Sequence, residues 1–183
     1  GSAAMFTVFT YIAPILTEAT GAGTLYVTAM LVIYGIGLTL GNWLGGVFAD
    51  RSIDRTLIVS LAGLATLLLL FAVTMFSPIA AAVTIFAWGI ATFAIVPPLQ
   101  MRVMEAASDA PNLASAVNIG AFNLGNAVGA AVGGGVIGLG LGYPVVSIAG
   151  AVMAFGGLVI VLVSRKAKVA SLLPVGVVYG KES

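Results

Sequence analysis

Two long stretches of this sequence contain no charged side chain. Residues 56–101 form a run of 46 residues without Lys, Arg, Asp, Glu or His, and residues 110–164 form a second run of 55. An apolar helix needs about 20 residues to cross the hydrocarbon core of a bilayer, which is roughly 30 Å thick. Each run is long enough for two crossings, so the pattern indicates an integral membrane protein.

Turn-forming residues divide the apolar sequence into six helical runs. The breaks contain Gly21 and Gly23, the pair Ser77 and Pro78, and the glycine-rich stretch that ends at Pro144. We therefore expect an all-α membrane protein with six transmembrane helices in a bundle over residues 1–165, followed by a cytoplasmic tail over 166–183. The expected helices cover about 3–17, 25–48, 56–76, 79–103, 112–137 and 144–164.

The cationic side chains predict the orientation of these helices. The loops after the first, third and fifth runs contain no Lys or Arg, so every cation falls on one side of the expected membrane. Cytoplasmic loops carry this excess of Lys and Arg, and the pattern therefore predicts that both termini are cytoplasmic in the plasma, or bacterial inner, membrane. The seven cations are Arg51, Arg55, Arg102, Arg165, Lys166, Lys168 and Lys181.

The first three runs resemble the last three in the order of their features. The first and fourth contain prolines, the second and fifth contain glycines spaced four residues apart, and the third and sixth contain neither pattern. Two three-helix units must be inverted relative to each other, and inverted repeats with interrupted helices are typical of secondary transporters. The alternative is that Gly and Pro are simply frequent in membrane helices. The residues concerned are Pro14, Pro97, Pro98, Gly37, Gly41, Gly45, Gly125, Gly129 and Gly133.

The glycine stripes have a structural interpretation as well. Small residues at four-residue spacing remove side-chain bulk from one face of a helix, so that a neighbouring helix can approach closely. We expect both stripes to serve mainly helix packing.

The loop after the second run resembles the G-x-x-x-D-R-x-G-R-R loop of the major facilitator superfamily. Gly46, Asp50, Arg51 and Arg55 occupy matching places, whereas Ile53 and Asp54 depart from the pattern. The resemblance implies a gating loop, in which Asp50 lies near the start of the fifth helix around Pro111 and Asn112. A carboxylate there would meet the positive end of the helix dipole and hold the cytoplasmic side shut. The alternative is a solvated loop that only satisfies the positive-inside rule.

Two further segments look like the drug:proton antiporter branch of that superfamily, near its arabinose-efflux-type members. They are residues 112–126 and residues 9–14. The resemblance covers about residues 1–165 and corresponds to the last six of twelve helices, so the chain would be half of a transporter. Gly1 is not an initiator Met and the first run is short, which favours a fragment. The expected partners are the lipid bilayer and the missing N-terminal half, or a second copy of this chain.

Polar residues within the apolar runs are candidates for a substrate cavity. Amides in hydrocarbon are costly unless they find partners, so Asn118, Asn123 and Asn126 should face other helices or a wet cavity. Thr10 and Tyr11 on the first helix could join them. The alternative is interhelical hydrogen bonding, and for the threonine a bond to its own helix.

Composition excludes several classes of function. The chain is 61% hydrophobic and only 7% charged, whereas about a quarter of the residues in a soluble domain are charged. It has no Cys, no His and no basic patch, so no cofactor, metal or nucleic-acid partner is expected, and an enzyme is very unlikely. Glu18 is the only acid outside the cytoplasmic loops and tail, and the acid that carries a coupling proton is expected in the missing half.

These observations together predict a function. We expect proton-coupled efflux of small amphipathic molecules, of drug or sugar type, by alternating access. The alternatives are a membrane scaffold or assembly module that does not transport, and a six-helix transporter that works as a homodimer.

Overall fold

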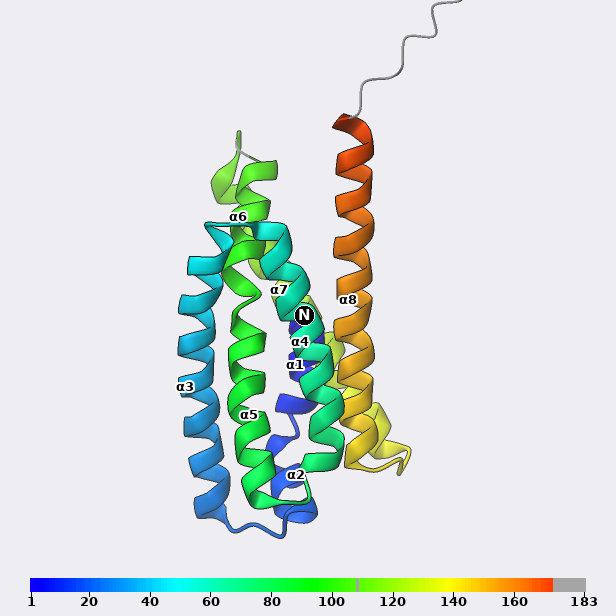
Figure 1. The fold of residues 1–183 in the computed structure, drawn as a ribbon. Helices are drawn as coiled ribbons and strands as arrows, with labels where there is room; N and C mark the ends of the chain where they lie inside the picture. The colour runs from blue at the N-terminus through cyan, green and yellow to red at the C-terminus, as the bar shows by residue number, and fades with distance from the viewer. Residues whose placement is uncertain (108, 173–183) are drawn as a thin grey trace, which may run out of the picture.

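The computed structural model describes residues 1–107 and 109–172, and these residues form helices without any strand. The helices run up and down in one bundle (Figure 1). They are α1 (Ser2–Phe9), α2 (Ile12–Ala19), α3 (Thr24–Ala49), α4 (Ile53–Thr74), α5 (Pro78–Phe93), α6 (Val96–Ala106), α7 (Pro111–Gly138) and α8 (Tyr143–Leu172).

The cations gather at one end of the bundle, at the top of Figure 1. The α3–α4 connection, the end of α6 and the last turns of α8 all lie there, whereas α2 and the α4–α5 and α7–α8 connections lie at the opposite end. We call the first the cationic end. Every Lys and Arg up to residue 166 belongs to it, namely Arg51, Arg55, Arg102, Arg165 and Lys166. The one-sided distribution expected from the sequence is therefore a feature of the fold.

Four segments of the described chain are long and apolar enough to cross a membrane. They are α3, α4, the continuous stretch Pro78–Ala106 that contains α5 and α6, and Tyr143–Lys166 in α8. The bent pair of α1 and α2 makes a fifth if it counts as one span. Helix α7 has 28 residues but is not among them, because asparagines and glycines lower its hydropathy. A sixth crossing stays a prediction.

Two of the expected helices are each broken into two. The chain bends by 46° between α1 and α2 at Thr10 and Tyr11, and α5 is separated from α6 at Ala94 and Ile95. A proline ring clashes with the carbonyl four residues before it. Pro14 therefore accounts for the break at Thr10, and Pro98 accounts for the break at Ala94. The sequence predicted proline-containing runs over 3–17 and 79–103, and the structure shows where each one breaks.

Several helix ends differ from the expected boundaries, among them the start of α4 and the end of α8. Helix α4 begins at Ile53 rather than at residue 56, because Ser52 caps it by accepting a hydrogen bond from the Arg55 backbone N–H at 3.3 Å. Helix α8 continues to Leu172, so the expected tail over 166–183 begins inside a helix. Residues 173–183 lie outside the described part of the chain.

The glycine stripes bring pairs of helices into backbone contact. A Cβ atom built on Gly37 or Gly45 of α3 would lie 2.6 Å from the carbonyl oxygen of Phe86 or Ala94, and one on Gly41 would overlap Ile90 of α5. The second glycine stripe, on α7, packs against atoms of α1 in the same way. There, Gly125 faces Ser2, Gly129 faces Ala3 and Gly133 faces Thr7. Each glycine-striped helix thus packs on the first segment of a broken helix from the other triplet of runs.

The core between these pairs is aromatic and aliphatic. The ring of Tyr34 lies 5.0 Å from that of Phe9 and 4.7 Å from that of Trp88, which in turn lies 6.0 Å from Phe71. Helix α4 packs along α8, and the buried Ser147 hydroxyl donates a hydrogen bond to the Leu68 carbonyl at 2.6 Å. Through Phe9 and Trp88, the aromatic contacts link the two broken helices to α3 and α4.

Candidate functional site: a cavity beside the helix breaks

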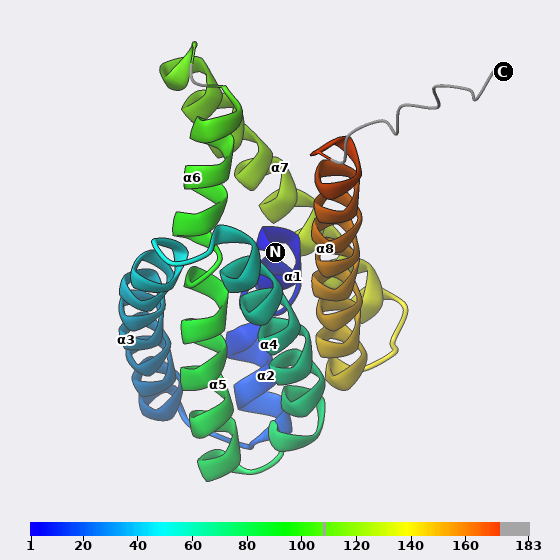
Figure 2. The ribbon, with the colours of Figure 1, turned by 45° about the horizontal axis from the view of Figure 1, so that its top comes forward.

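A cavity of about 490 Å³ lies between α1, α3, the α5–α6 break and α7. In Figure 2, α6 and α7 diverge from their connection at the top, and the start of α1 lies below them. The volume falls in the range of small-molecule sites, and most of the wall is apolar, as in such sites. The apolar lining consists of Met5, Phe6, Phe9, Leu38, Phe93, Ile95, Val96, Ile119 and Phe122.

Helix α7 supplies the amides of the wall. Asn118, Asn123 and Asn126 all line the cavity, so the structure brings together the three asparagines that the sequence singled out. Asn118 donates a hydrogen bond to the Gln100 side-chain oxygen at 2.6 Å, and Asn123 is exposed. The Asn126 side-chain oxygen is buried and has no hydrogen-bond partner in the described chain. The three asparagines therefore differ in what they can offer a ligand.

Gln100 is a cavity residue that sequence reasoning missed. It accepts from Asn118 and donates to the Ser115 hydroxyl at 3.1 Å, so one side chain of α6 ties two positions of α7. Ser115 and Asn118 are three residues apart and share a helix face. The available signal was a single amide in an apolar run, two residues after Pro98. We call these three residues the Gln100 clamp.

Thr10 and Tyr11 are not among the residues that line this cavity, and a substrate contact for them stays a prediction. The Thr10 hydroxyl donates to the Phe6 carbonyl of its own helix at 2.7 Å. The Tyr11 hydroxyl donates to the Ala130 carbonyl at 2.8 Å, and its ring lies on Gly133 and Gly134 of α7. The break between α1 and α2 falls at these two residues, which turns Tyr11 onto the glycine surface instead of the cavity.

The described cavity lining contains no charged side chain. Its remaining polar side chains are Ser2, Tyr34 and Thr92, and the buried Tyr34 hydroxyl meets no hydrogen-bond partner among the described residues. An ion would be poorly solvated in such a wall, because charge is costly to bury without a counter-charge. The arrangement suits an uncharged molecule with a large apolar surface and a few hydrogen-bonding groups.

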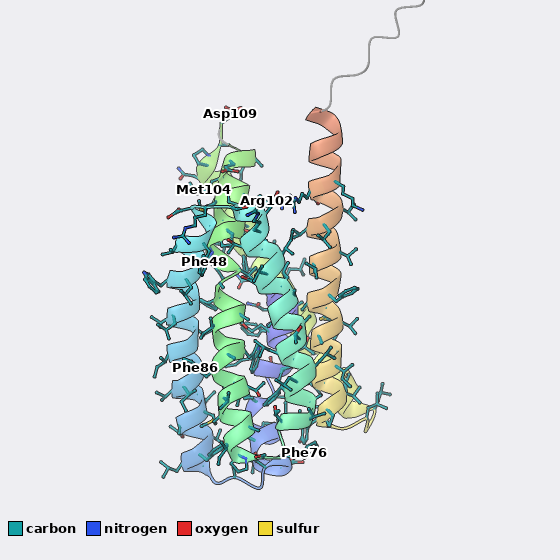
Figure 3. All side chains as sticks on the ribbon, viewed as in Figure 1. Phe48, Phe76, Phe86, Arg102, Met104 and Asp109 are labelled. Atoms are coloured by element: carbon teal, nitrogen blue, oxygen red, sulfur yellow. The ribbon has the colours of Figure 1, made fainter. Side chains whose placement is uncertain are left out.

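The loop with the family-like motif lies at the cationic end, near the Arg102 and Phe48 labels of Figure 3. Asp50 is exposed and its carboxylate makes no ion pair or hydrogen bond with any described residue. Helix α7 starts at Pro111 without a side-chain cap, so the expected contact between Asp50 and this helix stays a prediction. No heavy atom lies within 4 Å of a Cβ atom built on Gly46. Arg51 and Arg55 are both exposed.

Asp54 forms an ion pair that the sequence did not predict. Its carboxylate lies 3.3 Å from the Arg102 guanidinium, with both side chains about one-third exposed, at 35% and 30%. The pair joins the first turn of α4 to α6. A residue that departs from the motif therefore makes the contact across this end of the bundle.

Comparison with known proteins gives relatives that are membrane transporters. No family model matches the chain. It is 52% identical over 168 residues to the inner membrane transport protein YdhP of Escherichia coli K12, covering 92% of this chain and 43% of YdhP. It is 34% identical over 160 residues to the uncharacterized MFS-type transporter YfhI of Bacillus subtilis, covering 87% and 40%.

A third relative is named for drug resistance. The chain is 33% identical over 139 residues to the chloramphenicol resistance protein of Streptomyces lividans, covering 75% of this chain and 35% of that protein. The chain thus spans less than half the length of these curated relatives.

Proposed function

Because this chain belongs to the major facilitator superfamily of membrane transporters, we propose that it forms the C-terminal half of an exporter of small, uncharged amphipathic molecules. The observation that carries the proposal is the cavity of about 490 Å³, with its apolar wall and its amides. Its sides are the two broken helices and the two glycine-striped helices. These are the elements at which secondary transporters place their substrate.

The helix contacts support an inverted repeat of three helices. The glycine stripe of α3, in the first triplet, packs on α5 of the second triplet. The stripe of α7, in the second triplet, packs on α1 of the first. The same exchange occurs twice, with the broken helix of each triplet serving the other. We propose six spans on this basis, with α1–α2 and α5–α6 each counting as one and α7 as the most polar.

The polar residues of the wall suggest how the half would work. Asn123 and Asn126 would bind the hydrogen-bonding groups of the substrate, and the phenylalanines its apolar surface. Rocking against the missing half would then expose the cavity to each side in turn. The cationic end would face the cytoplasm, with Gly46, Asp50, Arg51 and Arg55 in its gating loop.

Proton coupling would depend on the missing half. No Asp or Glu lines the described cavity, and Glu18 lies on α2, toward the end opposite the cations. A proton carrier near the substrate is expected to be an ionisable residue within the membrane. We therefore propose that this residue belongs to the other six helices.

Export of chloramphenicol from whole cells tests the proposal. This molecule is neutral and amphipathic, and one relative is named for resistance to it. We expect export when the chain is co-expressed with the other half and none from the chain alone. Asn126→Leu should reduce export, whereas Asn42→Leu, at an exposed position of α3 outside the cavity, should not. Export by the chain alone, or equal export by both variants, would contradict the proposal.

A further inference from the structure

A second cavity, of about 370 Å³, lies under the α3–α4 connection. Its lining shares no residue with the first cavity. It combines two arginines with apolar and hydroxyl side chains, and we call it the α3–α4 groove. Its walls include Arg51, Arg55, Phe48, Val59, Ser60 and Ala94.

The two arginines are available to a ligand. Within the described residues neither side chain makes an ion pair or a hydrogen bond, and the Arg51 guanidinium lies 5.9 Å from the centre of the Phe48 ring. The nearby Asp54 is paired with Arg102 instead. Arg51 also borders a neighbouring hollow that is lined by Asp50, Asp54 and Glu105, but no acid lines the groove itself. The groove therefore carries two positive charges without an internal counter-charge.

The groove extends from the polar end of the bundle into its apolar part. Ser60 lies seven residues after the start of α4, which is about 10 Å at a rise of 1.5 Å per residue. The headgroup layer of one leaflet is only about 5–8 Å thick. Val59 and Phe48 are 70% and 47% exposed, so apolar side chains face outward below the arginines. The groove has a charged upper part and an apolar lower part.

We propose that the α3–α4 groove binds one anionic phospholipid of the leaflet at the cationic end. The phosphate lies between the Arg51 and Arg55 guanidinium groups, which bind phosphate through charge-assisted hydrogen bonds. The start of an acyl chain lies along Phe48 and Val59. Basic pockets between membrane helices bind anionic headgroups in this way. A zwitterionic lipid would place its ammonium group beside the two arginines, and the groove lining has no carboxylate to bind it. The groove should therefore prefer an anionic lipid.

The test measures which lipid stays bound to the purified 183-residue chain. The chain is equilibrated with equimolar phosphatidylglycerol and phosphatidylcholine, and the retained lipid is counted by native mass spectrometry. We expect phosphatidylglycerol to be enriched several-fold. The double variant R51Q/R55Q should lose this enrichment. The matched control R165Q/K166Q, which removes two charges from the same end at α8, should keep it.

A second variant leaves both arginines in place. Val59→Glu puts a carboxylate one helical turn from Arg55, where it can pair with that residue. It should exclude the lipid phosphate, whereas Val163→Glu on α8 should not. If R51Q/R55Q fails to fold, the comparison of Val59→Glu with Val163→Glu tests the lipid site instead. Equal retention of the two lipids, or enrichment that survives Val59→Glu, would overturn the proposal. Displacement of phosphatidylglycerol by inorganic phosphate would assign the groove to a soluble anion instead.

Discussion

At the scale of single residues, the glycines of α3 are not equivalent. A Cβ atom on Gly41 would overlap the Ile90 backbone, whereas one on Gly35 would meet no heavy atom within 4 Å. We expect Gly41→Ala to lower the free energy of unfolding by about 1–3 kcal/mol, because neither backbone can yield without separating α3 from α5. Thermal unfolding in detergent measures the effect.

The control for this prediction is Gly35→Ala in the same helix. Alanine is a better helix former than glycine, so this change should leave the stability unchanged or raise it slightly. If the two variants unfold at the same temperature, the close approach of α3 and α5 does not determine stability.

The two acids around the α3–α4 connection, Asp50 and Asp54, should also respond differently to substitution by asparagine. Asp54→Asn breaks the ion pair with Arg102 and should cost about 0.2–1 kcal/mol, because the pair is partly exposed. Asp50→Asn should leave the stability of this half unchanged, since the described carboxylate has no partner. In the assembled transporter, however, the proposed role of Asp50 as a gate predicts greater cytoplasmic opening.

Accessibility of cysteine probes at the cytoplasmic side separates these effects. A shift with Asp50→Asn that requires the second half supports the gate. Unchanged accessibility with Asp50→Asn, together with a shift for Asp54→Asn, would assign the closure to the Asp54–Arg102 pair instead.

At the scale of helices, the Gln100 clamp connects a short helix to a long one. Helix α6 has 11 residues and follows a break, and its side chain at residue 100 bonds both Ser115 and Asn118 of α7. We expect a coupling energy of about 0.6–1.7 kcal/mol between Gln100 and Asn118 in a double-mutant cycle. The cycle uses Gln100→Ala, Asn118→Ala and the double variant, measured by unfolding. Additive effects would show that the clamp does not join the two helices.

Much of the helical framework could be predicted from the sequence, because apolar runs and turn residues are local signals. The spacing of Gly37, Gly41 and Gly45 predicted close packing, but not that α5 would be the partner. That choice depends on how helices cross, which no local pattern encodes. For the same reason the sequence found the asparagines of α7 but missed Gln100, whose partners lie 15 and 18 residues away.

Tyr11 and Asp54 show two further limits of sequence reasoning. The orientation of Tyr11 depends on the exact residue at which the helix breaks. Pro14 predicted a break without predicting that Tyr11 would turn away from the cavity. Asp54 looked like a mere departure from a loop pattern, and its ion pair with Arg102 depends on α6 returning to the same end of the bundle.

At the scale of the whole molecule, two outer surfaces differ in composition. The exposed side of α8 carries large apolar residues such as Val152, Phe155 and Ile160, which suit contact with lipid chains. The exposed side of α7 also carries large apolar residues such as Leu124, but it combines them with the exposed amide of Asn123 and with small residues such as Ala121 and Ala127. Small residues let helices approach closely in membranes. We therefore expect α7, and not α8, to face the second half of the proposed transporter.

A pair of tryptophan variants tests this expectation. Ala127→Trp adds bulk to the exposed face of α7, and Val152→Trp adds a smaller increment of bulk to the exposed face of α8, where Val152 is 64% exposed. When the chain is co-expressed with an affinity-tagged second half, the first variant should be recovered several-fold less than the second. Circular dichroism checks that both variants keep their helices. Equal recovery would mean that α7 does not meet the partner, and the cavity beside it would then open to lipid instead of lying between two halves.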